Sequence, residues 1–242
     1  MRKIATAIVI CFTFFSLPTY GQTSSDDRVA YANLIRKEYG LNHELINGEQ
    51  YYNRYSRTKG HPYFLDERYR TGSLTLEGRV YEELGLRFDI HSQHVELQYR
   101  NFSGGDNQII TVADNVDAFT IGKYQFRKLE LEHGPEKFYQ VLSTDCFTCY
   151  ILWKKDLLPL NGSFTYIEQF STAKRSLWLD LNGELHAFHS RKDFSGLFPE
   201  EYHKEIKRFL SKNQFKFRTA SVDEIIRNVE AVCNLLKEKA NL

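Results

Sequence analysis

Short runs of alternating apolar and polar residues recur along the chain from residue 73 to residue 189. In one run Leu86, Phe88 and Ile90 alternate with polar neighbours. Successive side chains of a strand point to opposite faces, so a period of two predicts strands with one buried face. The predicted strands are 73–84, 86–90, 95–99, 108–113, 116–121, 124–130, 138–143, 147–153, 164–170, 175–181 and 184–189.

Turn residues separate these runs. Asn161-Gly162 and Asn182-Gly183 suit two-residue hairpin turns, because both central residues of such a turn need positive φ. Short strands without long crossovers predict an antiparallel β meander. We expect about ten strands, arranged as a curled sheet, an open barrel or a sandwich.

Three helical segments flank the predicted strands. Residues 24–40 begin with a possible cap and end at a glycine, and residues 199–212 carry an apolar stripe at helical spacing. Ser221 and Glu224 form a capping box in front of the longest stripe. The run at 147–153 is apolar on both faces, so its second face needs a cover. The sequence predicts an α+β fold with one N-terminal helix and two C-terminal helices packed on the sheet.

The N-terminus has the layout of a secretory signal peptide. A short basic region precedes an apolar run at 4–17, and small residues stand three and one positions before Gln22. We expect a signal peptide at 1–21 and export to the periplasm, the cell envelope or the extracellular space. The mature chain, 22–242, is then a single β-rich domain in which 197–242 is a helical tail packed on the sheet. An uncleaved membrane anchor is the alternative; otherwise we expect no integral membrane insertion.

Opposite charges nearly balance over the chain, with 32 basic and 31 acidic residues. Such a chain has no large field to attract nucleic acid. We therefore expect no nucleic-acid partner, and an envelope component or a glycan is the partner class that remains.

Cys146-Phe-Thr-Cys149 has the spacing of a redox pair. Thioredoxin-type chemistry needs a following helix, whereas this motif lies between predicted strands. Two alternatives stay open for it, a structural disulfide or free packed thiols. Cys233 lies on the apolar helical stripe and is predicted to be a small core residue.

No residue pattern predicts catalysis or a cofactor. His91/His94 and His186/His189 have a spacing that places side chains on opposite faces of a strand. We therefore predict solvated or half-buried histidines and no metal site, unless the fold brings the two pairs together. Serine-nucleophile, zinc-helix and phosphate-loop motifs are not found in the sequence, so no catalytic residue is assigned.

Residues 51–70, YYNRYSRTKGHPYFLDERYR, are rich in tyrosine and basic side chains. Tyrosine beside arginine can stack on sugars or flat ligands. The alternative, which we favour, is a structural segment that runs extended into the first strand with its rings packed on the sheet. The candidate ligand-binding residues are Tyr51, Tyr55, Arg57, His61 and Tyr63.

The chain resembles a group of uncharacterised exported proteins of Bacteroidota. The matching residues are Asn47-Gly48, Gly60-His61-Pro62-Tyr63-Phe64, Gly78 with Tyr81, Arg87-Phe88-Asp89-Ile90 and Cys233-Asn234-Leu235. The resemblance implies a β meander with a tail of two helices and no known activity. The leading hypothesis is an exported, non-enzymatic binding or envelope-associated protein. The alternative is a secreted or periplasmic hydrolase with carboxylate or histidine groups on the sheet face.

Overall fold

The computed structural model describes residues 44–101, 104–131 and 135–240. The chain divides into a unit of residues 1–40 and a unit of residues 41–242, and the described residues all belong to the second. The expected signal peptide at 1–21 and the expected helix at 24–40 lie outside the described residues.

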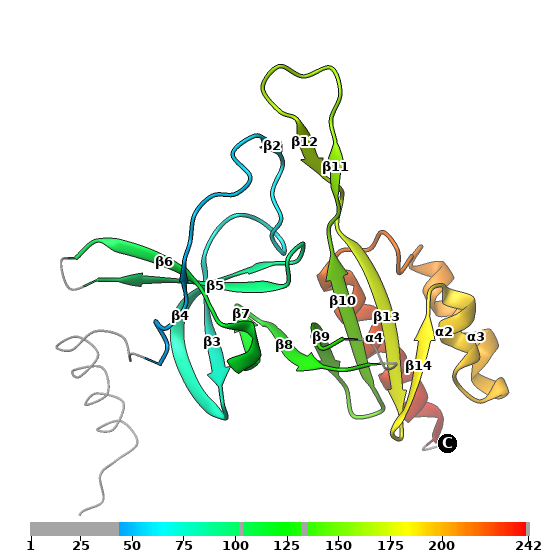
Figure 1. The fold of residues 1–242 in the computed structure, drawn as a ribbon. Coiled ribbons are helices and arrows are strands. Elements are labelled where there is room, and N and C mark those ends of the chain that lie inside the picture. The colour runs from blue at the N-terminus through cyan, green and yellow to red at the C-terminus, as the bar shows by residue number, and fades with distance from the viewer. Residues whose placement is uncertain (1–43, 102–103, 132–134, 241–242) are drawn as a thin grey trace, which may run out of the picture. The chain divides into compact units, whose positions relative to one another are not determined.

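One open, eleven-stranded antiparallel sheet dominates the described unit (Figure 1). The strand order is β1-β6-β5-β4-β3-β7-β8-β9-β10-β13-β14, with β1 and β14 at the edges. The strands are β1 (Glu49–Gln50), β3 (Arg70–Leu76), β4 (Arg79–Asp89), β5 (His94–Arg100), β6 (Asp106–Ile110), β7 (Val116–Ile121), β8 (Tyr124–Leu129), β9 (Lys137–Ser143), β10 (Thr148–Lys154), β13 (Lys174–Leu181) and β14 (Glu184–Phe188). The antiparallel α+β class is confirmed, and the eleven-stranded sheet is not closed.

The sheet contains two meanders that meet at β3 and β7. After β6 the chain passes through a short 3₁₀ helix, η1 (Ala113–Asn115), and β7 returns to pair with β3. Gly72 permits this close approach, because a Cβ built there would lie 1.9 Å from the Thr120 carbonyl oxygen. Any other residue at 72 would force the two meanders apart.

A small second sheet was not predicted. It consists of β11 (Leu157–Pro159), β12 (Glu168–Phe170) and β2 (Thr58–Lys59), in the order β11-β12-β2 with β12 and β2 parallel. A strand was predicted at 164–170, but only residues 168–170 of that run form one, which is β12. The backbone turns before them, where the Ser163 hydroxyl accepts a hydrogen bond from the Tyr166 N–H.

The expected hairpin turn at Asn182-Gly183 is present. Asn182 has φ 56° and Gly183 has φ 89°, as a two-residue turn with two positive φ angles requires. The Asp180 carboxylate accepts a 2.8 Å hydrogen bond from the Gly183 N–H. Local turn chemistry therefore sets the register of β13 against β14.

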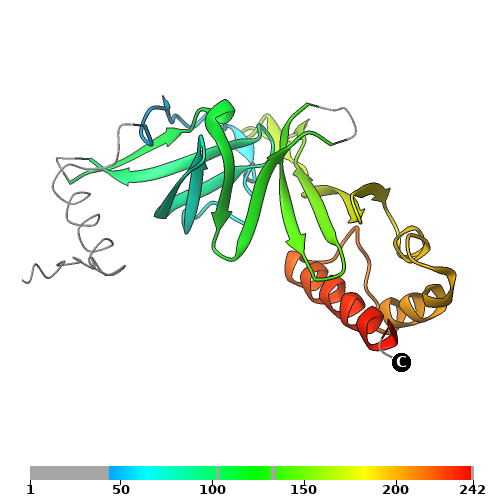
Figure 2. The ribbon, with the colours of Figure 1, turned by 90° about the horizontal axis from the view of Figure 1, so that it is seen from below.

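Three helices follow the last strand: α2 (Arg191–Gly196), α3 (Glu200–Lys212) and α4 (Val222–Ala240). Figures 1 and 2 place them beside β13 and β14, away from β5 and β6. The predicted capping box is formed, since the Ser221 N–H donates to the Glu224 carboxylate and the Glu224 N–H donates to Ser221 Oγ. Helix α2 was not predicted from the sequence. Among the described residues, no helix is both long enough and apolar enough to cross a membrane.

A disulfide joins Cys146, in the turn before β10, to Cys233 on α4. Cys233 lies in the core, as predicted, but it is also a disulfide partner, which was not predicted. A pairing of Cys146 with Cys149 is wrong. Cys149 lies within β10 with its free thiol fully buried in the core. The alternation along β10 explains this difference, because it turns Cys149 inward while Cys146 still belongs to the turn.

Candidate functional site

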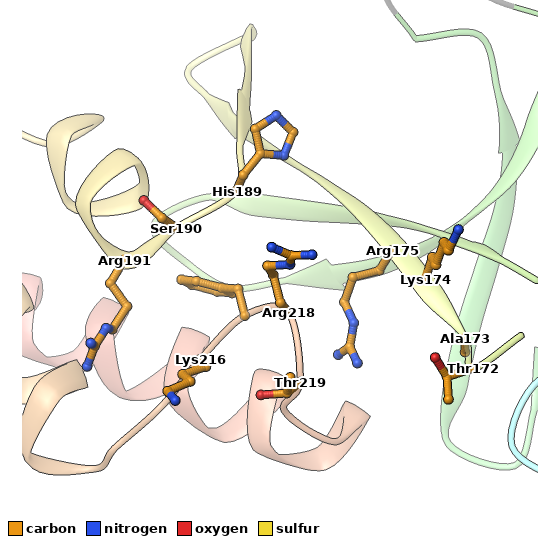
Figure 3. Close-up of a pocket in the computed structure, with 11 residues that line it drawn as sticks. Thr172, Ala173, Lys174, Arg175, His189, Ser190, Arg191, Lys216, Arg218 and Thr219 are labelled. Atoms are coloured by element: carbon orange, nitrogen blue, oxygen red, sulfur yellow. The ribbon is translucent and has the colours of Figure 1, made fainter.

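A cavity of about 770 Å³ lies between the start of β13, the segment joining β14 to α2 and the segment joining α3 to α4 (Figure 3). We call it the basic pocket, because five of its eleven lining residues are lysine or arginine, a sixth is histidine and none is acidic. It is lined by Thr172, Ala173, Lys174, Arg175, His189, Ser190, Arg191, Lys216, Phe217, Arg218 and Thr219.

Phe217 anchors the segment that carries two of these cations. Its buried ring packs against Phe188 at a centroid distance of 4.9 Å and against Phe194 at 5.0 Å. Lys216 and Arg218, its sequence neighbours, are exposed. The core therefore fixes the backbone of this segment, while its charged side chains border the cavity.

Arg175 is the least satisfied cation of the basic pocket. Its guanidinium lies over the Trp153 ring, 4.5 Å from the centroid, and one Nη donates a 2.5 Å hydrogen bond to the Ala220 carbonyl. Its Nε is buried and has no hydrogen-bond partner among the described residues. Burial lowers the pKa of this guanidinium, as expected for a cation removed from water without a counter-ion.

The other cations differ in how firmly they are held. Lys174 pairs with Asp156 at 2.6 Å, and Arg191 donates to the Ser211 hydroxyl. Within the described ranges, Lys216 and Arg218 have no ion-pair partner. Several cations around one cavity, none of them facing a lining carboxylate, give a local positive potential. Such a site can hold a carboxylate, sulfate or phosphate group, and arginine can bind these groups with two parallel hydrogen bonds.

A second cavity, of about 690 Å³, adjoins the basic pocket. We call it the aromatic pocket. The two share Thr172, Ala173, Arg175 and Thr219. The aromatic pocket is lined by these four and by Gly60, His61, Tyr63, Phe64, Leu65, Ile90, Trp153, Lys155, Phe170, Ser171, Ala220, Ser221, Val222 and Glu224.

Two titratable groups of the aromatic pocket touch each other. Lys155 Nζ donates a 2.7 Å hydrogen bond to the His61 carbonyl and lies 3.3 Å from His61 Nδ1. The Tyr63 N–H also donates to Nδ1, so this ring nitrogen is an acceptor. Burial lowers the pKa of Lys155 to about 8, and burial and the nearby Lys155 charge lower the pKa of His61.

Of the five residues predicted to bind a ligand, His61 and Tyr63 line the aromatic pocket. Tyr51 lies on another cavity but contacts Tyr63, with hydroxyl oxygens 3.2 Å apart. Tyr55 packs edge-on against Phe170, at a centroid distance of 4.9 Å. Arg57 has an exposed side chain, and its carbonyl accepts a hydrogen bond from the Ile167 N–H. The structure therefore brings only part of the predicted set together.

Tyr51 and Tyr63 belong to a cluster around Arg87 that the sequence did not predict. The Arg87 guanidinium is 3.8 Å from the Tyr63 ring centroid and 4.3 Å from that of Tyr69. It forms a 2.5 Å ion pair with Glu96, whose side chain is only 3% exposed. This buried, paired charge with stacked rings places Tyr51, Tyr63 and Tyr69 against β4 and β5. The segment 51–70 itself consists largely of turns and bends, so the expected extended run into the first strand is wrong.

The sequence pointed to none of the lysines and arginines of the basic pocket, and His189 was considered only as part of a metal-like spacing. The cations of this pocket come from three segments between 174 and 218, each too short to mark a basic patch. The only sequence features that could have indicated this cavity were two short basic stretches, Lys174-Arg175 and Lys216-Phe217-Arg218. Only the fold, which places β13 beside the segment after α3, makes them one site.

Among the described residues, no group of three or more His, Cys, Asp or Glu side chains is placed to hold a metal ion. His91, His94, His186 and His189 therefore form no such group. No family model, no curated protein and no solved structure matches the chain.

Proposed function

We propose that the protein is an exported, non-enzymatic binding protein that holds the anionic group of its ligand in the basic pocket. The carrying observation is the concentration of five lysine and arginine side chains, one histidine and no acidic side chain around one cavity. The partner class is an envelope component or a glycan that bears carboxylate, sulfate or phosphate groups.

Arg175 gives the strongest physical support for an anionic ligand. A buried polar group without a hydrogen-bond partner costs free energy, and a buried charge costs more. An anion beside the guanidinium would compensate the buried charge, whereas a neutral ligand would not. The lining of the basic pocket offers no carboxylate, so a bound anion would be the counter-ion of Arg175.

The disulfide between Cys146 and Cys233 supports export. Disulfides persist in oxidising compartments and are rare in the cytosol. The predicted signal peptide at 1–21 and the resemblance to exported proteins of Bacteroidota point in the same direction. We therefore retain the periplasm, the cell envelope or the extracellular space as the proposed location.

One observation favours the alternative hydrolase. His61 and Lys155 are in contact in the aromatic pocket, and both pKa values are lowered. Such pairs occur in active sites. However, Lys155 and the Tyr63 N–H both point donors at His61 Nδ1, and no nucleophile or carboxylate of the described residues is bonded to the pair. Cleavage of an activated ester that is abolished by His61→Ala would favour the hydrolase.

Titration with sulfate and phosphate tests the proposed function, with ¹⁵N-labelled protein followed by NMR. We expect shifts in the resonances of Arg175, Arg218 and their neighbours. The double variant Lys216→Gln, Arg218→Gln should bind about tenfold more weakly, since ~0.7 kcal/mol for each partly exposed charge amounts to ~1.4 kcal/mol. Added sodium chloride should weaken the binding further.

The matched control is Lys204→Gln, Lys207→Gln, which removes two exposed lysines from α3 outside the basic pocket. Its affinity should equal that of the wild type. Equal losses in both double variants would mean that net charge, rather than the basic pocket, determines binding. A glycan array with neutral, carboxylated, sulfated and phosphorylated members would then identify the natural ligand class.

A further inference from the structure

We propose that the basic pocket and the aromatic pocket form one site for an amphipathic anion, a ligand whose charged group is joined directly to an apolar body. This inference rests on the proposed function, because it assumes that the charged group lies in the basic pocket. The two cavities share four lining residues, so they are neighbours with a common wall: Thr172, Ala173, Arg175 and Thr219.

Arg175, one of the four shared residues, places a cation between the basic pocket and the apolar surface of the aromatic pocket. One face of its guanidinium lies over Trp153, which lines the aromatic pocket, and one Nη is fixed by the Ala220 carbonyl. Among the described residues, the second Nη has no hydrogen-bond partner, and no carboxylate pairs with the guanidinium. An anion bound to this Nη would lie directly beside an apolar surface. The rest of its molecule would then contact rings and aliphatic side chains rather than water.

The lining of the aromatic pocket suits an apolar body. Phe64, Trp153 and Phe170 contribute rings, and Ile90 and Val222 contribute aliphatic groups. The volume of about 690 Å³ falls in the range of small-molecule sites, ~300–1,000 Å³.

Apart from Arg175, the charged groups Glu224 and Lys155 of this lining are already engaged. The Glu224 carboxylate accepts hydrogen bonds from the backbone N–H and the hydroxyl of Ser221, at 2.6 and 2.9 Å. Lys155 donates to the His61 carbonyl. The rings and aliphatic side chains of the lining are then the surface that can contact an apolar body.

Leu65 supplies an independent observation at this pocket. It has φ 62°, a left-handed conformation that disfavours a residue with a Cβ, and the residue is 39% exposed. Glycine or asparagine would suit this backbone better. Leu65 lies outside the core cluster, so burial in the core compensates its strain only in part. An apolar ligand in the aromatic pocket would provide further compensation by covering the side chain.

Three probes separate the contributions of charge and apolar body. Methanesulfonate carries the anion alone, 2-naphthalenemethanol carries the apolar body alone, and naphthalene-2-sulfonate carries both. Each is titrated into the ¹⁵N-labelled full chain, and dissociation constants are taken from the resonances of residues that line the two cavities. We expect naphthalene-2-sulfonate to bind at least about tenfold more tightly than either of the other probes, because it alone satisfies Arg175 and buries apolar surface.

Leu65→Asn is the decisive variant. Asparagine accepts positive φ, so the variant should fold at least as well as the wild type. We expect it to lower the affinity ratio of naphthalene-2-sulfonate to methanesulfonate about threefold or more and to leave methanesulfonate binding unchanged. Leu158→Asn is the matched control, since Leu158 is 41% exposed and lines neither pocket. Its ratio should equal that of the wild type.

The outcomes separate this inference from the proposed function. Equal affinities for naphthalene-2-sulfonate and methanesulfonate would overturn the joint site and leave the anion pocket standing. A ratio that is unchanged in Leu65→Asn, or an equal affinity for 2-naphthalenemethanol and naphthalene-2-sulfonate, would overturn it as well. If neither anion shifts the resonances of the basic pocket, the proposed function fails and the inference falls with it.

Discussion

Tyr63 shows how one side chain of the tyrosine-rich segment stabilises the fold. It is 4% exposed, its ring lies under the Arg87 guanidinium, and its hydroxyl contacts Tyr51. Truncation of a buried aromatic side chain costs ~3–5 kcal/mol. We therefore expect Tyr63→Ala to lower the melting temperature by roughly 10 °C, measured by circular dichroism.

Arg57→Ala is the control from the same segment. Its side chain is exposed, and only its carbonyl bonds to another strand, so the melting temperature should change by about 1 °C or less. The opposite pattern, a stable Tyr63→Ala that loses ligand binding, would show that the segment is a binding surface rather than a structural one.

Lys155 predicts a pH dependence of stability. Its folded pKa of about 8 lies below the ordinary value of 10.5, so between these values the unfolded chain binds more protons than the folded one. The free energy of unfolding therefore gains a contribution that rises with pH across this window. Below pH 8 the folded state carries the whole cost of a charged, buried amine, and above 10.5 the amine is neutral in both states.

The variant Lys155→Met removes this contribution. Urea unfolding at pH 7, 8, 9 and 10 should show that the stability of the variant, relative to the wild type, declines as pH rises. Lys204→Met, at an exposed position on α3, is the matched control. A difference between Lys155→Met and the wild type that is constant over this pH range would contradict the assignment.

The disulfide is the main covalent link between the sheet and α4. Cys146 and Cys233 are separated by 87 positions, and Lys237 of the same helix pairs with Asp145. Closing a loop of this length lowers the entropy of the unfolded chain, and removal of such a bond costs ~2–5 kcal/mol. Reductant should therefore lower the melting temperature of the wild type by roughly 5–15 °C.

The melting temperature of Cys233→Ser should equal that of the reduced wild type, both without and with reductant. Mass spectrometry of the oxidised protein should show one disulfide. A wild-type melt that does not respond to reductant would mean that the bond is either not formed or not stabilising.

The elements differ in how well the sequence predicts them. The period of two and the Asn182-Gly183 turn are local signals, and they were sufficient for most strands of the large sheet. Helix α2 has only six residues, too few for a helical period to be recognised. Strand β2 has two residues and exists through its parallel pairing with β12, far along the chain. Such elements depend on tertiary contacts that a local pattern does not contain.

The candidate site was less predictable than the fold. The cations of the basic pocket come from segments around 174, 190 and 217, and the partner of Cys146 lies 87 positions away. In the other direction, the tyrosine-rich segment was conspicuous in the sequence, yet its most buried ring, Tyr63, packs on Arg87. Composition marked this segment, but only the fold shows which side chains remain available to a ligand.

At the scale of the whole molecule, the balance of 32 basic and 31 acidic residues conceals a local excess of positive charge. Carboxylates elsewhere pair with neighbouring cations, as Glu96 does with Arg87 and Asp145 with Lys237. The lining of the basic pocket has none. Because the whole chain is nearly neutral, it does not attract polyanions non-specifically. The local positive charge of the basic pocket still allows a specific anion to bind there.

The core of the described unit is one cluster that extends from Leu45 to Cys233 and includes residues of the sheet and of all three C-terminal helices. Phe188 of β14 packs on Phe194 of α2, and Phe147 beside β10 packs on Phe198. The later strands therefore lack a complete core without the helices. A chain of residues 22–190 that carries Cys146→Ser should lose its cooperative melt and bind the dye 8-anilinonaphthalene-1-sulfonate.

The control for this truncation is the full chain with Cys146→Ser and Cys233→Ser, which lacks the same disulfide but keeps the helices. We expect it to melt at a lower temperature than the wild type, yet in one sharp transition, because its aromatic contacts between sheet and helices remain. If the truncated chain melts as sharply as this control, the sheet has a core of its own and the helices are an accessory layer. A broad melt of the truncated chain alone would establish that the helical tail completes the single core on which the strands, and with them both pockets, depend.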